Sequence, residues 1–193
     1  RQRQMCIRDR IDTILEQTEK LDFLIQSLVK LSRMESGIIA VHSEDTTIKQ
    51  MLESIQQQFN VKVREKNITL SLCDTDLHVR CDSKWTVEAL GNIVDNAIKY
   101  TACGGNVQIK VEQYSFFVKI DIIDDGIGIE KEEIPKIFGR FYRSLSVADQ
   151  PGVGIGLFLA REIIQAQKGY IKVTSEREKG SIFSVFLPIS KKE

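Results

Sequence analysis

The sequence predicts an α+β fold: a two-layer α/β sandwich preceded by a long helix. Three observations lead to this prediction. Apolar residues recur at helical spacing near the amino terminus, and several later runs alternate apolar and polar residues as strands do. The helices and strands after the first helix are mixed without regular alternation, which favours an α+β sandwich over a parallel sheet built from β-α-β units.

The composition is that of a globular protein with one core of ordinary size. The chain has 193 residues, of which 42% are hydrophobic and 28% are charged. Lysine plus arginine balance aspartate plus glutamate at 27 each, so no bulk charge indicates a nucleic-acid or anionic-lipid partner. The four cysteines form no metal-like spacing with the two histidines, which predicts reduced thiols. No apolar run approaches the ~20 residues that a membrane-spanning helix needs.

The amino-terminal part divides into a leader and a helix. Residues 1–10 have no apolar stripe and no helix cap, and we expect them to be a non-native or disordered leader. A frayed native helix start is the alternative. Residues 11–37 form a partial domain, a helix that ends at Gly37 and whose stripe needs a partner helix. That stripe consists of Ile14, Leu15, Leu21, Leu24, Ile25, Leu28 and Leu31.

Residues 38–193 form the second predicted domain, which begins with a short extended run at 38–41. Asp82 or Ser83 is expected to cap a helix that ends at Tyr100. Strands are expected at 68–72 and 77–81, which pair, at 106–111 and 116–123 as a hairpin, and at 170–174 and 181–187 as a closing pair. Helices are expected at 48–63, near 130–137 and at 155–166.

The helix ending at Tyr100 carries a polar face. At 100° per residue, Asn92, Asn96 and Lys99 fall within about 60° of one another, and the apolar side chains lie opposite, where they would face a sheet. Carboxamide oxygens suit Mg²⁺ and an ammonium group neutralises phosphate, so this face suits a magnesium triphosphate. A solvated polar face is the alternative.

Two glycine-rich turns follow. In the first, Asp125-Gly126-Ile127-Gly128 comes directly after an apolar strand, and an aspartate acceptor at this point could accept a hydrogen bond from the exocyclic amine of adenine. An ordinary aspartate–glycine turn is the alternative. In the second, Gly152, Gly154 and Gly156 precede an apolar helix, where backbone N–H groups and the positive helix end can face phosphate. A flexible linker is the alternative there.

Between the two turns lies the aromatic and basic cluster Phe138-Gly139-Arg140-Phe141-Tyr142-Arg143. Aromatic anchors next to the polar loop 144–151 are typical of a lid. Arg140 or Arg143 could reach phosphate. The alternative is a pair of surface arginines beside aromatic side chains of the core.

In this order, the motifs resemble those of the catalytic ATP-binding domain of sensor histidine kinases. These domains belong to the wider gyrase, heat-shock chaperone, histidine kinase and mismatch-repair ATPase superfamily and have the Bergerat-type fold. Residues 31–37 also resemble the end of the second helix of the dimerisation and phosphotransfer bundle. The matching motifs are residues 92–100 (N box), 125–128 (first glycine box), 138–141 (F box), 152–157 (second glycine box) and 180–183 (last glycine motif).

The resemblance implies ATP and Mg²⁺ as cofactors. Asn96 would be the metal ligand, Asn92 and Lys99 would contact the phosphates, Tyr100 would lie near the nucleotide and Asp125 would accept from the adenine amine. The complete implied nucleotide site consists of Asn92, Asn96, Lys99, Tyr100, Asp125, Gly126, Gly128, Ile129, Phe138, Arg143, Gly152, Gly154, Gly156, Leu157 and Ser181.

The resemblance also implies a protein-histidine kinase fragment. The γ-phosphate would go to a histidine on a bundle helix absent from this chain, since His42 lacks the Thr-Pro or Ser-Pro context of an acceptor. Expected partners are a response regulator receiver domain and, in the full-length protein, a second copy through the helical bundle, with no nucleic acid. The expected location is the cytoplasmic domain of a bacterial inner-membrane sensor, attached to the membrane only through missing amino-terminal segments.

Two other functions are alternatives to a histidine kinase. One is a vestigial dimerisation and signalling module of the same fold, against which the retention of all motifs speaks. The other is a superfamily ATPase that acts on DNA or client proteins, against which the neutral net charge and the helix end at 31–37 speak.

Overall fold

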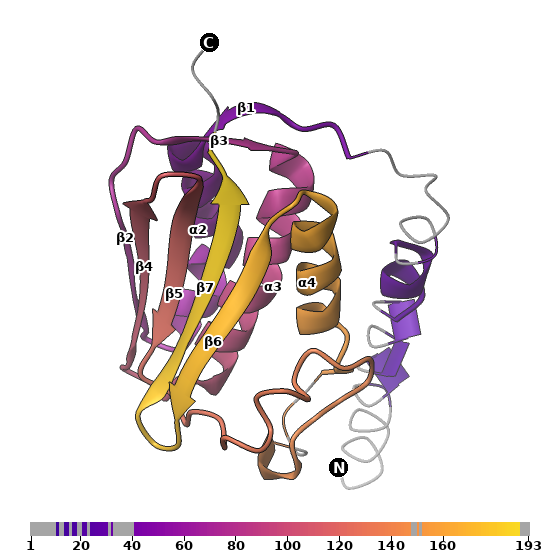
Figure 1. Cartoon of the computed structure of the whole chain (residues 1–193). Helices are drawn as coiled ribbons and strands as arrows, with labels where there is room; N and C mark the ends of the chain where they lie inside the picture. Colours follow the sequence, from indigo (N-terminus) through magenta and orange to yellow (C-terminus); the bar gives the residue numbers. More distant parts are fainter. Residues whose placement is uncertain are drawn as a thin grey trace, which may run out of the picture.

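The computed structural model describes residues 41–147, 150 and 152–189, and scattered residues between 11 and 32. Its main body has two layers, a five-stranded sheet and three helices that cover one face of it (Figure 1). This confirms the predicted α+β sandwich. The helices are α2 (Ile48–Glu65), α3 (Ser83–Tyr100) and α4 (Gly156–Ala166).

The sheet has the strand order β2-β4-β5-β7-β6. β2 and β4 run parallel, and the other neighbours are antiparallel, including the two predicted pairs β4–β5 and β6–β7. The strands span Thr69–Leu72 (β2), Asn106–Gln113 (β4), Phe117–Asp124 (β5), Tyr170–Glu176 (β6) and Gly180–Pro188 (β7).

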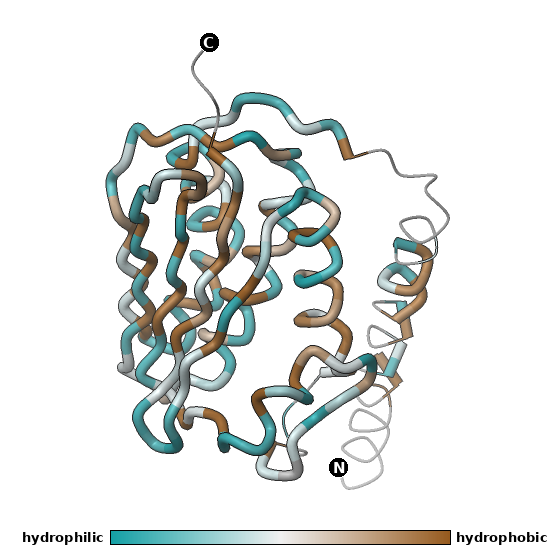
Figure 2. The backbone as a smooth tube through the Cα atoms, in the orientation of Figure 1, coloured by the Kyte–Doolittle hydropathy of each residue, from teal (hydrophilic) through white to brown (hydrophobic). Residues whose placement is uncertain are grey.

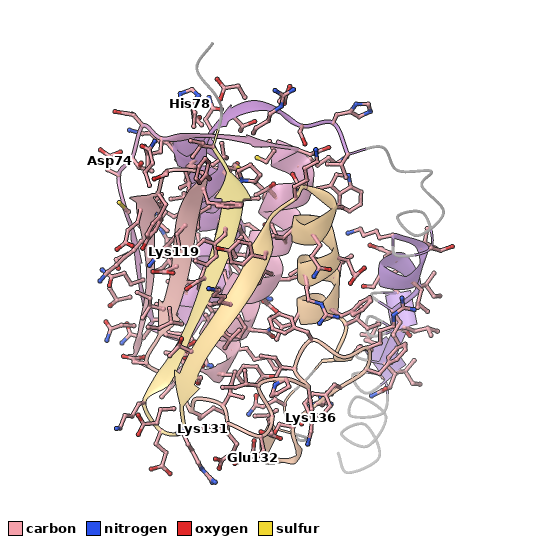
Figure 3. All side chains as sticks on the ribbon, viewed as in Figure 1. Asp74, His78, Lys119, Lys131, Glu132 and Lys136 are labelled. Atoms are coloured by element: carbon pink, nitrogen blue, oxygen red, sulfur yellow. The ribbon has the colours of Figure 1, made fainter. Side chains whose placement is uncertain are left out.

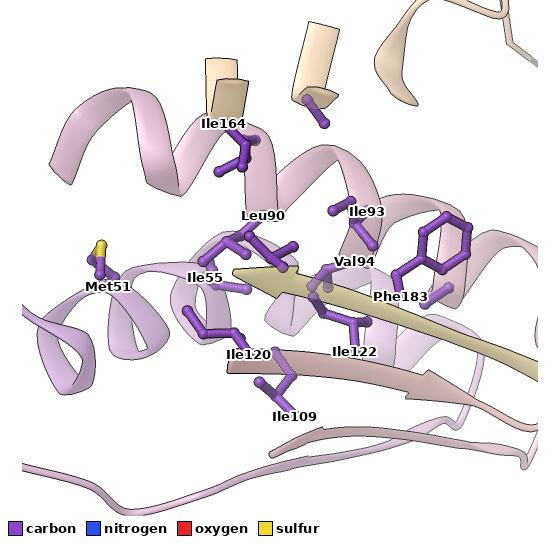
Figure 4. Close-up of a cluster of buried hydrophobic side chains, with 14 of the residues drawn as sticks. Met51, Ile55, Leu90, Ile93, Val94, Ile109, Ile120, Ile122, Ile164 and Phe183 are labelled. Carbon is purple, nitrogen blue, oxygen red and sulfur yellow. The ribbon is translucent and has the colours of Figure 1, made fainter. Parts of the chain in front are cut away.

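The core lies between the sheet and the helices. Every second residue of β5 faces the helices, and Val118, Ile120 and Ile122 are fully buried, as strand alternation requires. Figure 4 shows Ile120 and Ile122 below Leu90, Ile93 and Val94 of α3. In Figure 2, hydrophobic residues recur along the strands of the sheet and along the helices that cover it. The apolar side of α3 therefore packs on the sheet as predicted.

Helix α3 occupies the centre of the helical layer and begins at a predicted cap. The backbone N–H of Trp85 donates to the carboxylate of Asp82 at 3.2 Å. At the far end of α4, the carboxamide oxygen of the buried Gln167 accepts from the Asp82 N–H at 2.6 Å and from the Thr86 hydroxyl at 3.2 Å. The start of α3 is thereby fixed to the end of α4.

Two predicted elements differ in the structure. Residues 77–81 do not pair with 68–72; instead β3 (His78–Cys81) pairs with β1 (Glu44–Thr47) in a separate two-stranded sheet. The reason is tertiary: Val79 and Cys81 are buried, with the Cys81 Sγ 3.9 Å from the Met51 Sδ of α2.

Residues 130–137 form a series of turns and not the predicted helix. The N–H groups of both Glu133 and Ile134 donate to the Glu130 carbonyl, so the segment mixes two hydrogen-bond spacings. Pro135 has no N–H to continue a regular ladder, and proline disfavours the helical conformation of the residue before it.

The predicted amino-terminal helix is only partly described. Residues 24–30 are helical, and the Lys30 ammonium lies 2.7 Å from the Glu88 carboxylate of α3. The leader 1–10, the helix end at 33–37 and most of the extended run 38–41 lie outside the described residues, so these boundaries and the long helix remain predictions. Within the described part of the chain, no helix is long and apolar enough to cross a membrane.

Candidate functional site

A cavity of about 590 Å³ lies between α3, the loop that follows β5 and the segment that precedes α4. Its size is that of a small-molecule site. In Figure 3, Lys131, Glu132 and Lys136 mark the loop after β5, at the opposite end of the molecule from Asp74 and His78. Twelve of the fifteen predicted site residues line the cavity: Asn92, Asn96, Lys99, Tyr100, Gly128, Ile129, Arg143, Gly152, Gly154, Gly156, Leu157 and Ser181.

The polar face of α3 forms one wall, because its apolar face is used by the sheet. The Asn92 Nδ2 donates to the Glu88 carbonyl one turn earlier at 3.0 Å, which fixes this carboxamide. Its Oδ1 lies so close to the start of α4 that a Cβ at Gly156 would meet it at 3.1 Å. The Asn96 carboxamide lines the cavity and makes no hydrogen bond within the described residues, so it is available to a ligand.

Asp124, the last residue of β5, places a carboxylate in the cavity wall. It continues the inward-facing series of β5 and is only 7% exposed. The Gly126 N–H donates to its Oδ1 at 2.9 Å, and the Ser181 backbone also hydrogen-bonds it. Burial nevertheless dominates and raises the pKa of Asp124 to about 6.

The structure places Asp125 outside the cavity lining. This residue is exposed, does not line the cavity and accepts hydrogen bonds from the backbone and side chain of Asn106, at 2.9 and 2.8 Å. Neighbours along a strand point to opposite faces, so only one of the two aspartates can face the helices. Asp124, which the sequence prediction did not include, is the aspartate of this pair that lines the cavity, and the alternation of β5 is the sequence signal that points to it.

Two other predicted residues lie outside the cavity lining. Gly126 passes the end of α3 so closely that a Cβ would come within 2.6 Å of the Tyr100 carbonyl oxygen. Phe138 is buried in the core, where the Arg161 guanidinium lies 5.4 Å from its ring, and its neighbour Ile137 lines the cavity in its place. Other lining residues absent from the prediction include Ile127, Val153 and Ile155.

Glycines bring backbone close to backbone around the cavity. Gly128 has a φ of +68°, and a Cβ there would come within 2.0 Å of the Glu176 carbonyl oxygen. Gly154 has a φ of +77°, and a Cβ there would come within 2.6 Å of the Tyr142 carbonyl oxygen. Only glycine combines this conformation with such contacts. The Ile129 N–H, bonded to the Ser175 hydroxyl at 2.8 Å, holds the first turn on β6.

The side of the cavity toward α4 is electropositive. Burial and the neighbouring Arg143 lower the pKa of Lys99. Within the described residues, no ion pair joins the Lys99 ammonium to a carboxylate; it lies 4.8 Å from the Tyr100 ring. The Arg143 Nη2 donates to the Val147 carbonyl at 2.8 Å. Arg140, the alternative phosphate contact, instead has its guanidinium 4.6 Å from the Phe158 ring.

The cavity thus has two chemically different parts. A buried carboxylate can accept from an N–H donor at one part, and an ammonium, a guanidinium and the amino-terminal end of α4 can bind anionic groups at the other. A ligand that carries both an amine donor and phosphates matches this arrangement.

Comparison with known proteins identifies the family. Residues 81–191, more than half of the chain, match the family model described as Histidine kinase-, DNA gyrase B-, and HSP90-like ATPase. The chain therefore belongs to this family, and its relatives and structural neighbours place it among the catalytic ATP-binding domains of histidine kinases.

The sensor histidine kinase WalK of Bacillus subtilis is 32% identical over 182 residues, which cover 92% of this chain and 30% of WalK. The chain thus spans about a third of the length of such relatives. Among solved structures, the Acinetobacter baumannii histidine kinase AdeS matches with a TM-score of 0.72 and 26% identity, over 94% of this chain and 84% of the other. Full-length ShkA in complex with AMPPNP shares the fold, with a TM-score of 0.82 over 96% of this chain and 39% of the other, at 20% identity.

The buried carboxylate yields a prediction about stability. The pKa of Asp124 is higher in the folded than in the unfolded chain, so the folded state binds more protons between about pH 4 and about pH 6 and loses stability as the pH rises through this window. The variant Asp124→Asn lacks this loss. It should match the wild type near pH 4 and exceed it by about 1–3 kcal/mol near pH 7 in urea unfolding.

The matched control is Asp125→Asn, which changes the neighbouring, exposed carboxylate and its contacts with Asn106. This control should not be stabilised near neutral pH. If Asp124→Asn unfolds at the same urea concentration as the wild type at every pH, burial of the ionised Asp124 carboxylate does not lower the free energy of unfolding.

Proposed function

We propose that the cavity binds Mg-ATP with adenine at Asp124 and the phosphates at Lys99, Arg143 and the turn before α4. The single observation that carries the proposal is the position of the Asp124 carboxylate. It is buried, held by the Gly126 and Ser181 backbone and directed into the cavity. A carboxylate acceptor selects the exocyclic amine of adenine over the carbonyl that guanine has at the corresponding position.

The phosphate side follows from charge and backbone geometry. Gly152 lies next to the Lys99 ammonium, which a Cβ at this position would approach to 2.9 Å. The turn therefore brings backbone and ammonium to one place, and the amino-terminal end of α4 adds unpaired N–H groups there. Arg143 stands at the same wall and can contribute a second cation.

The residues present also fit a magnesium ion. Asn96 supplies a carboxamide oxygen from the face of α3, and Mg²⁺ takes one or two protein oxygens together with phosphate oxygens. When bound, the ion would neutralise charge on the triphosphate. Asn92 is held by Glu88 close to the start of α4 and is proposed to face the phosphates with Lys99.

We further propose that the bound ATP is the phosphoryl donor for a histidine on a helix of the dimerisation bundle. WalK and AdeS, both named as histidine kinases, support this class of reaction. The side chains of the site would act mainly by holding the triphosphate in line with the attacking nitrogen and by stabilising charge on the transferred group. In the full-length protein, a dimer formed by the bundle and a response regulator receiver domain would complete the relay at a bacterial inner membrane.

The adenine assignment predicts how ADP affinity changes when either of two neighbouring aspartates is replaced by asparagine. Isothermal titration with ADP should show binding that Asp124→Asn weakens at least about tenfold, because the amide presents a donor to the adenine amine. The variant Asp125→Asn should bind ADP within about twofold of the wild type, since this carboxylate bonds Asn106 outside the cavity. Loss of binding in Asp125→Asn with retention in Asp124→Asn would overturn the assignment.

The metal assignment predicts a separate effect for Asn96→Ala. Wild-type affinity for ATP should rise on addition of Mg²⁺, and this gain should shrink by about tenfold in the variant, while affinity for adenosine stays unchanged. Titration of ATP with and without the metal measures the gain directly. A variant that keeps the full gain would exclude Asn96 as the ligand.

A further inference from the structure

The carboxyl-terminal end of α3 is held by a lysine from another element. Lys66 follows α2, and its Nζ donates to three backbone carbonyls: Ile98 at 2.9 Å, Lys99 at 2.6 Å and Thr101 at 2.7 Å. All three hydrogens of the ammonium are therefore used on one helix end. The backbone of Lys66 is fixed as well, because its carbonyl accepts from the Gly104 N–H at 3.2 Å.

This arrangement satisfies groups that a helix leaves unpaired. The last carbonyls of a helix have no intrahelical donor, and they carry the negative end of the helix dipole. An ammonium placed there meets both needs at once. The tetrahedral ammonium can reach three oxygens around one point, whereas the planar guanidinium of arginine spreads its donors in a fork.

The same helix end forms part of the nucleotide cavity. Lys99 and Tyr100, whose side chains line the cavity, lie within the segment 98–101 whose carbonyls Lys66 binds. The Ile127 N–H of the first glycine turn donates to the Tyr100 carbonyl at 3.3 Å. Lys66 and the first glycine turn therefore both hydrogen-bond the carbonyls at this end of α3.

We propose that Lys66 is a positioning residue for the nucleotide site, which holds the end of α3 so that Lys99 faces the phosphates. Lys66 does not line the cavity and acts only through the helix end. The inference rests on the proposed assignment of the phosphate side to Lys99. It predicts that loss of Lys66 affects ligands with phosphates more than ligands without them.

The test compares ADP and adenosine binding in Lys66→Met, Lys66→Arg and the control Lys49→Met. Lys49 lies at the start of α2 and pairs with the exposed Asp74 at 2.9 Å, so the control removes the same charge from the opposite end of α2 without touching α3. Both Lys66 variants should weaken ADP binding at least about fivefold and change adenosine binding by less than about twofold. The control should bind both ligands as the wild type does.

Equal weakening of ADP and adenosine would overturn the inference, because Lys66 would then support the fold in general. The inference would also be overturned if Lys66→Arg bound ADP within about twofold of the wild type. A positive charge without the hydrogen bonds to three carbonyls would then be enough for ADP binding. If Lys66→Met does not fold, Lys66→Arg decides alone. Failure of the wild type to bind ADP would instead contradict the proposed function.

Discussion

The burial of the Asp124 carboxylate is the constraint on which the site depends. The residue sits on the helix-facing side of β5, where every other inward position is apolar and fully buried. An ionised group in such a place costs stability, which is why its pKa is raised to about 6. Two backbone N–H groups lower this cost without removing it, and Asp124 lines the cavity, where a ligand donor can meet it.

The glycines around the cavity follow from the same constraint. For the Gly126 N–H to reach Asp124, the chain must turn at once past the end of α3, where the Tyr100 carbonyl leaves no room for a Cβ. On the other side, a Cβ at Gly180 would come within 1.9 Å of the Asp124 carbonyl oxygen. Close packing of backbone on backbone at both sides keeps the carboxylate buried and its donors aligned.

The charged groups of the cavity disfavour the empty protein and favour a bound ligand. Burial lowers the pKa of Lys99, and repulsion from the neighbouring Arg143 guanidinium lowers it further. Like Asp124, these groups are held in positions that disfavour the empty protein and favour a ligand of complementary charge. Phosphate binding would relieve the repulsion, and an adenine amine would satisfy the carboxylate. The ligand that fits is therefore the one that relieves both costs.

Much of this could be predicted from the sequence, because it depends on local pattern. The polar face of α3, the cap at Asp82 and the two antiparallel strand pairs follow from periodicity and turn residues, and twelve of the predicted site residues line one cavity. The sequence prediction named Asp125, which lies outside the cavity, and not Asp124, which lines it, because it followed adjacency to the glycines and not the alternation of β5. The pairing of β1 with β3 and the contacts of Lys66 join distant segments, and no local pattern encodes them.

The central claim is that the Asp124 carboxylate accepts a hydrogen bond from the adenine amine. The pH dependence of adenosine binding tests this claim most directly. Adenosine has no phosphates, so its binding should report the titration of this carboxylate. Its affinity should rise roughly tenfold between about pH 5 and about pH 7, with the midpoint near pH 6, because the ionised carboxylate is the stronger acceptor. An affinity that is flat across this range, or the same rise in Asp124→Asn, would contradict the account.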